Sequence, residues 1–175
     1  MISEAGEPRR DLFLRSGLEA ADVVRAHRAA LQVLRDGIET AHVDAYSDDA
    51  WPQDVVPAYE QALAMAAREV AEGVRPARSD PGMGIDVDVR DDAQFDVLLA
   101  LAPHTIHAEA WQRGRLVLSA SDTGTALCLT VTPRQEERLL SRLDALGIPR
   151  TAFTTRPARR GRWISRWKRA ARTSR

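Results

Sequence analysis

Apolar and polar residues alternate with two different periods along the chain, and the first half follows the period of a helix. After Ser16, which can cap a helix together with Glu19, apolar positions recur every three or four residues up to Gly37. A second stripe of this kind predicts a helix over residues 55–72 that begins after Asp54. We expect the two helices to pack as an antiparallel pair.

After a loop rich in proline and glycine, at residues 75–84, the period falls to two. Apolar residues that alternate with polar ones are typical of a strand with one face in water. The predicted strands are 85–90, 95–102, 105–111, 115–120 and 125–131. Because the connections between them are short, we expect a five-stranded antiparallel meander.

A third helix has a clear start at Thr132, which is followed by Pro133 and by Gln135 in the pattern of a capping box. Its leucine stripe ends at Gly147 and predicts a helix that covers one face of the sheet. The expected fold class is α+β: a helical pair, a five-stranded antiparallel meander, a closing helix and a basic C-terminal tail.

The 175 residues are expected to form one domain with two appendages. The predicted organisation is a flexible arm over 1–14, a single α+β domain over 15–149 and a tail over 150–175. Within the domain, the helical pair takes 15–74 and the meander with its helix takes 84–149. With a single cysteine and no apolar run of the roughly 20 residues that cross a bilayer, we expect a cytoplasmic protein without a cofactor.

Charge is divided unequally between the domain and the tail. Residues 1–149 contain fifteen cations and twenty-five carboxylates, whereas residues 150–175 contain ten cations and no carboxylate. The formal net charge of zero therefore combines an acidic body with a basic tail. Such a division indicates binding, either of the tail to an outside polyanion or of the tail to the chain's own body.

The tail also carries two tryptophans among its cations. On a helix, Trp163, Ile164 and Trp167 would share a narrow apolar face, as in segments that lie in a membrane interface. The same residues could instead bind phosphates while the indoles stack on unpaired bases. We expect a non-enzymatic binding protein whose tail engages a polyanion, an anionic membrane ahead of nucleic acid. The residues expected to bind it are Arg159, Arg160, Arg162, Trp163, Arg166, Trp167, Lys168, Arg169 and Arg172.

The acidic body supports an alternative function. Its carboxylates around the first predicted strand could form a surface for a basic partner protein. That reading describes an immunity-like or antitoxin-like neutraliser. The residues expected on this surface are Asp86, Asp88, Asp91 and Asp92.

One short motif has a catalytic counterpart. Asp122-Thr123-Gly124, followed by Thr125, resembles the catalytic tripeptide of retropepsin-like aspartic proteases. That resemblance would imply a carboxylate that activates water. It covers about four residues, and the preceding Ser119-Ala120-Ser121 differs from the apolar strand of such enzymes. We therefore interpret the motif as a hairpin turn and expect no catalytic residue.

Histidines suggest a metal site, but too few of them converge. His104 and His107 have an odd spacing, so on a strand they would point to opposite faces, and only His107 and Glu109 would share one. A catalytic zinc site usually has three protein ligands, and only two residues converge here. We therefore predict no metal site. His27 lies on the apolar stripe of the first helix, where we expect a hydrogen-bonded boundary residue.

Overall fold

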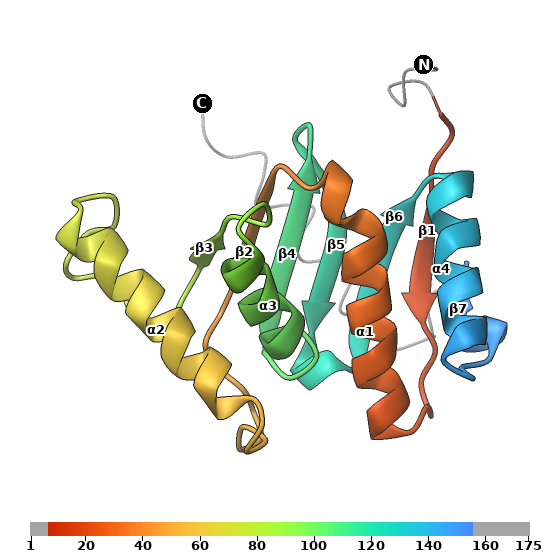
Figure 1. The fold of residues 1–175 in the computed structure, drawn as a ribbon, viewed down its shortest axis with the longest axis horizontal. Helices are drawn as coiled ribbons and strands as arrows, with labels where there is room; N and C mark the ends of the chain where they lie inside the picture. The colour runs from red at the N-terminus through yellow and green to blue at the C-terminus, as the bar shows by residue number, and fades with distance from the viewer. Residues whose placement is uncertain (1–6, 156–175) are drawn as a thin grey trace, which may run out of the picture.

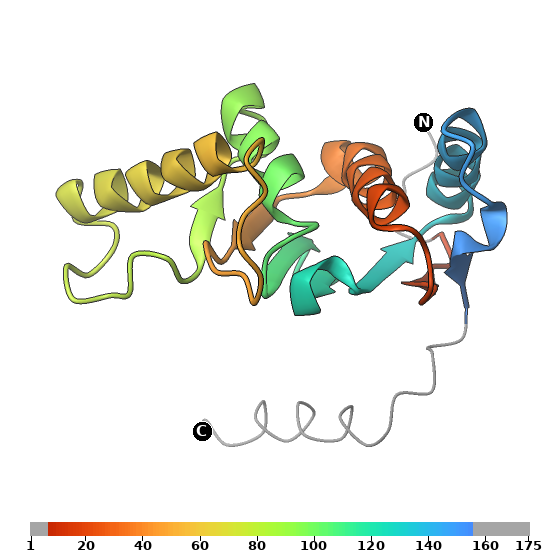
Figure 2. The same cartoon turned by 90° about the horizontal axis from the view of Figure 1, so that it is seen from below.

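The computed structural model describes residues 7–155, which form one antiparallel sheet with helices on one side (Figure 1). The seven strands follow the order β3-β2-β4-β5-β6-β1-β7. The four α-helices of the described residues lie on the same side of the sheet, as the view turned by 90° shows (Figure 2). The fold is therefore α+β, as the sequence predicts, with seven strands in place of five.

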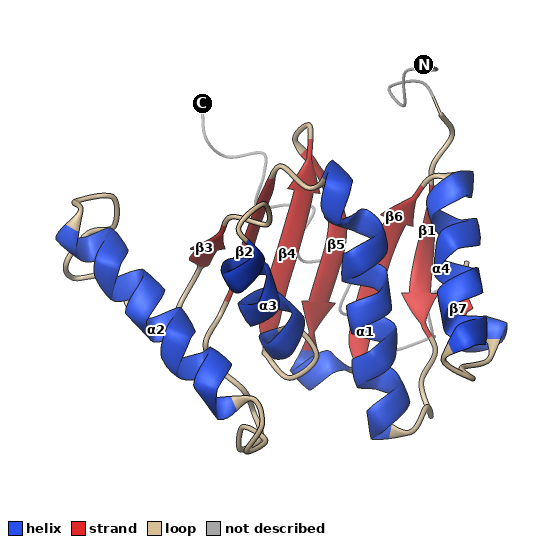
Figure 3. Ribbon diagram, in the orientation of Figure 1, coloured by secondary structure: helices blue, strands red, loops and turns tan. Residues whose placement is uncertain are grey.

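Helices and strands alternate along the chain more often than the hydrophobic periodicity predicts (Figure 3). The strands are β1 (Arg10–Leu14), β2 (Thr40–Val43), β3 (Ile85–Val87), β4 (His107–Gln112), β5 (Arg115–Ser121), β6 (Ala126–Val131) and β7 (Phe153–Thr154). The helices are α1 (Ala20–Leu34), α2 (Val56–Ala71), α3 (Asp92–Leu101) and α4 (Pro133–Ala145). Three short 3₁₀ turns, η2 (Arg35–Gly37), η3 (Asp122–Gly124) and η4 (Arg150–Ala152), complete the described part. No helix among residues 7–155 is both long and apolar enough to cross a membrane.

The core lies between the sheet and the helices. Alternate strand residues such as Val43, Ala110 and Leu129 are fully buried, whereas their neighbours along each strand are partly exposed. This alternation is expected for an antiparallel sheet that is covered on one side only. We call the side away from the helices the open face of the sheet.

The second half of the sequence folds largely as predicted. Strands β4, β5 and β6 form the expected meander, and β3 lies at one edge of the sheet. Helix α4 begins with the predicted capping box, in which the Thr132 side chain accepts from the Gln135 backbone and the Gln135 side chain accepts from that of Thr132. Its leucines Leu139 and Leu143 are buried, and Gly147 follows the helix with a positive φ of 69°.

The predicted central strand over 95–102 is wrong, because these residues belong to helix α3. An apolar run of this length suits a buried strand or a buried helix equally well. The start of the helix decides between them: the Asp91 side chain accepts a hydrogen bond from the backbone N–H of Gln94 at 3.1 Å. This bond satisfies one of the free amides of the first helical turn.

The predicted helical pair is also wrong, although both helices exist. Strand β2 separates α1 from α2 in sequence and enters the sheet between β3 and β4. Helix α1 packs against α4 and α3, while α2 packs against α3 and β3. The predicted caps differ too, since Glu19 and Val55 occupy the N-cap positions and neither side chain bonds to the helix.

Both predicted appendages contribute a strand to the sheet. Residues 10–14 of the expected arm form β1, which pairs with β6 and β7. Residues 153–154 of the expected tail form β7, at the edge opposite β3. The sheet therefore includes residues on both sides of the segment 15–149.

Candidate functional site

Several polar residues of neighbouring strands lie side by side on the open face of the sheet. Strand register places His42 of β2 directly opposite Glu109 of β4, and Glu109 opposite Ser119 of β5. His107 lies two residues before Glu109 on β4, hence on the same face, and opposite Ser121. Two imidazoles, a carboxylate and two hydroxyls therefore share one area of this face.

His42, Glu109 and His107 form a compact cluster. Nε2 of His42 lies 3.2 Å from Oε2 of Glu109, and Nε2 of His107 lies 3.5 Å from Oε1 of the same carboxylate. The two imidazole centroids are 6.1 Å apart. One potential ligand atom from each residue lies within 4.8 Å of the others, and the side chains are 31 %, 16 % and 30 % exposed. The three residues can therefore converge on one small ion that solvent can reach.

The strand periodicity of the sequence identifies two of these three residues but not the third. His107 and Glu109 share a face as predicted, but the third ligand comes from His42, on a strand that was not predicted. His104, the alternative histidine, precedes β4 in a turn after α3 and is not part of the cluster. The conclusion that only two ligands converge is therefore wrong.

Cys128 lies on the same face, directly opposite Ser119. Desolvation by burial raises the pKa of its thiol to about 11, and the nearby Asp11 carboxylate acts in the same direction. The thiol is therefore protonated at neutral pH and is a poor nucleophile. Within residues 7–155, the group of converging ligand atoms consists of His42, His107 and Glu109 and does not include Cys128.

The four aspartates of the predicted acidic surface lie around β3 and the start of α3, and three of them have structural partners. Asp91 caps α3, Asp88 accepts from the backbone N–H of Arg90 at 3.0 Å, and Asp92 pairs with Arg35 at 2.6 Å. Asp86, the fourth, is exposed on β3 directly opposite His42. Part of the predicted surface therefore serves the fold.

A shallow groove of about 410 Å³ lies beside these aspartates, between α2 and the start of α3. Four carboxylates line it, those of Glu69, Glu72, Asp86 and Asp91, together with one cation, Arg68. Residues 7–155 as a whole contain twenty-four carboxylates and sixteen arginines, a formal charge of −8. The groove is thus an acidic concavity on an acidic domain.

The Asp122-Thr123-Gly124 motif forms the turn η3 between β5 and β6, as the hairpin interpretation predicts. Asp122 and Thr123 both have a left-handed φ of 54°. The backbone carbonyl of Asp122 accepts from the Thr125 hydroxyl at 2.9 Å, and the Thr123 N–H donates to the Thr105 carbonyl at 3.1 Å. The first bond closes the turn, and the second attaches it to the loop that precedes β4.

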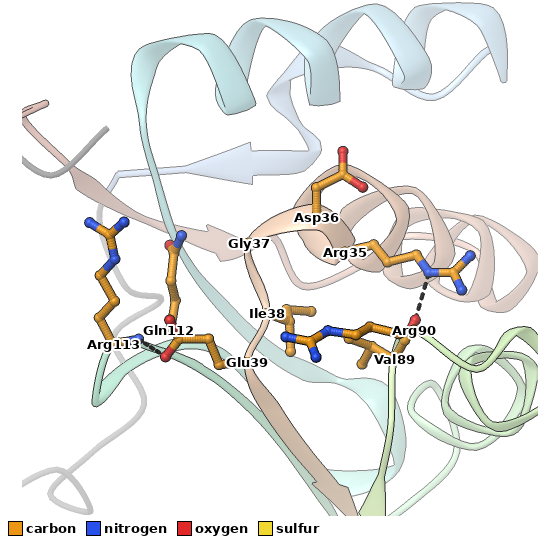
Figure 4. A pocket seen from close by; sticks show the side chains of 9 residues that line it. All are labelled: Arg35, Asp36, Gly37, Ile38, Glu39, Val89, Arg90, Gln112 and Arg113. Atoms are coloured by element: carbon orange, nitrogen blue, oxygen red, sulfur yellow. Dashed lines mark hydrogen bonds between the residues drawn. The ribbon is translucent and has the colours of Figure 1, made fainter. Parts of the chain in front are cut away.

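A larger depression, of about 580 Å³, lies where α1 ends (Figure 4). Its charged side chains are mixed in sign, and several are already engaged. Arg35 donates to the Val89 carbonyl at 2.8 Å, and Glu39 accepts from the Arg113 N–H at 2.6 Å. Because these contacts hold the walls together, we assign this depression a structural role.

All nine predicted polyanion-binding residues, from Arg159 to Arg172, lie outside the described residues. No family model, curated protein or solved structure matches the chain. The chemistry of the sites within residues 7–155 therefore indicates what the protein can bind.

Proposed function

We propose that the protein binds one divalent transition-metal ion, preferably zinc, through His42, His107 and Glu109. The observation that carries this proposal is the convergence of three potential ligand atoms within 4.8 Å of one another, from two neighbouring strands. Two imidazoles with one carboxylate are a common ligand set for zinc, and imidazole ligands favour transition metals over magnesium or calcium.

The distances within the cluster suit such an ion. With metal–ligand bonds of about 2.0–2.2 Å, ligand atoms around one zinc ion are roughly 3.0–3.6 Å apart. The two imidazole–carboxylate distances, 3.2 Å from His42 to Oε2 of Glu109 and 3.5 Å from His107 to Oε1, fall in this range. Because the side chains project from two paired strands that each have a neighbour on both sides, the protein supplies a rigid frame for them.

Zinc titration distinguishes this proposal from a purely structural role, in which the two imidazoles and the carboxylate only bind one another. By isothermal titration calorimetry, we expect the full-length chain to bind one zinc ion. His107→Ala and His42→Ala should each weaken binding by about 100-fold, since loss of even an outer-shell partner costs about 10–100-fold.

His104→Ala is the matched control, because it removes a neighbouring histidine that does not belong to the cluster. It should leave zinc affinity unchanged. Equal affinity in all four proteins, or no zinc binding by the unaltered chain, would contradict the proposal.

We propose as a second function that the acidic groove between α2 and α3 binds a basic protein, as a neutraliser of the immunity or antitoxin kind would. The observation in its favour is that four carboxylates line one concavity. Opposite charges across an interface accelerate association and select the partner. Polyanion binding by the basic tail is a separate proposal, which the composition of residues 150–175 supports.

The groove can be tested with a nona-arginine peptide as a defined basic probe. Replacing Glu72 and Asp86 together by lysine should weaken peptide binding by about tenfold at low salt and reduce its salt dependence. These two positions are chosen because Asp91 caps α3. The control replaces Asp48 and Asp49, which lie outside the groove, and changes net charge equally. Equal loss in both double variants would assign the binding to net charge alone.

A further inference from the structure

We infer that the metal ion held by His42, His107 and Glu109 takes a small oxyanion as a further ligand, which the hydroxyls of Ser119 and Ser121 hydrogen-bond. The inference rests on the metal site proposed above and names the class of ligand it would bind: a carboxylate or a phosphate group. It is carried by strand register, which places one serine opposite each of the two β4 ligands.

The cluster leaves the coordination sphere of a zinc ion incomplete. Among residues 7–155, no fourth histidine, cysteine, aspartate or glutamate joins the three. Zinc takes at least four ligands, and sites with three protein ligands leave a position for water or substrate. Because the three side chains are partly exposed on the open face, a ligand from solution can reach that position.

The side chains around the cluster determine from which side such a ligand can approach. On the β5 side the neighbours are small: Ser119 and Ser121 come first, followed by Ala126 of β6 opposite Ser121. On the β3 side the neighbour of His42 is Asp86, whose carboxylate repels an anion. An anion is therefore accommodated above β5, beside both serine hydroxyls.

Charge and hydrogen-bonding capacity select the same chemistry. A divalent ion bound by two neutral imidazoles and one carboxylate keeps a net charge of about +1. A serine hydroxyl can donate a hydrogen bond, and such bonds are stronger when the acceptor is ionised. An oxyanion has several oxygens, so it can bind the metal with one and accept from a serine with another. A neutral ligand would not balance the positive charge of the metal site.

Cobalt(II) substitution gives a direct readout, because the visible absorption of the ion depends on its ligands. The full-length chain is loaded with Co²⁺ and titrated in separate experiments with acetate, a carboxylate probe, and with methylphosphonate, a phosphate-like probe. We expect a saturable change in the spectrum with at least one probe. The Ser119→Ala/Ser121→Ala double variant should retain Co²⁺ binding and bind that probe about tenfold more weakly.

Ser141→Ala is the control, since it removes an exposed serine on α4. A response to one probe only identifies the ligand as carboxylate-like or phosphate-like and supports the inference. If Co²⁺ does not bind, the metal site itself is wrong and the inference falls with it. If Co²⁺ binds but neither probe changes its spectrum, the inference alone is overturned. Equal probe affinity with and without the two serines would overturn their role.

Discussion

Gly124→Ala is expected to lower the free energy of unfolding by about 2–5 kcal/mol, the largest loss we predict for one added methyl group in this fold. Gly124 closes the turn between β5 and β6 with a φ of 86°. A Cβ atom at this position would overlap the carbonyl oxygen of Pro103 and lie 2.8 Å from its carbonyl carbon. Backbone atoms cannot move aside as a flexible side chain can, so the turn and the loop before β4 must separate.

The expected loss has two parts, which a second variant separates. A left-handed backbone costs an alanine about 1–2 kcal/mol, and overpacking adds about 1–3 kcal/mol. Gly147→Ala incurs only the first part, because φ is 69° there and no atom lies within 4 Å of the added Cβ. Urea unfolding followed by circular dichroism measures both variants. If both variants lost the same free energy of unfolding, the overlap of the added methyl group with Pro103 would cost nothing.

Local signals in the sequence were sufficient wherever one element could be recognised on its own. The capping box at Thr132 and the strands around the turn at Asp122 are specified by a few adjacent residues. Helix α3 also has such a signal, Asp91 followed three residues later by Gln94. The apolar run that follows carries no clear period, so it suits a strand as well as a helix. The cap at Asp91 is the local feature that distinguishes them.

The candidate site could be predicted only in part, because one of its three residues depends on strand pairing. His107 and Glu109 are two residues apart on one strand, a spacing that local periodicity can reveal. His42 joins them because β2 enters the sheet beside β4, although β3, α2, α3 and their loops lie between the two strands in sequence. The only local signal for β2 is four alternating residues, Thr40–Val43, within an acidic stretch. Pairing of this kind is decided by tertiary packing rather than by local preference.

The second large effect expected is a pH dependence of stability that arises from His27. The apolar stripe of α1 predicts a hydrogen-bonded residue at the boundary of the core, but the structure buries His27 completely. Its Nδ1 donates to the Val23 carbonyl at 2.8 Å, which leaves Nε2 unprotonated, buried and without a partner. Desolvation lowers the pKa of His27 to about 4, and the nearby His104 acts in the same direction.

Because the pKa of His27 is lower in the folded state than its value of about 6.5 in an unfolded chain, its protonation favours unfolding. Its full contribution to stability is present above pH 6.5 and is lost as the pH falls toward 4. The expected loss over this window is on the order of 3 kcal/mol. Urea unfolding at about pH 7 and about pH 4.5, analysed as a difference between the unaltered chain and His27→Leu, isolates this contribution from that of the carboxylates. The variant should lose less stability than the unaltered chain on acidification, whereas an equal loss in both would exclude His27 as the cause.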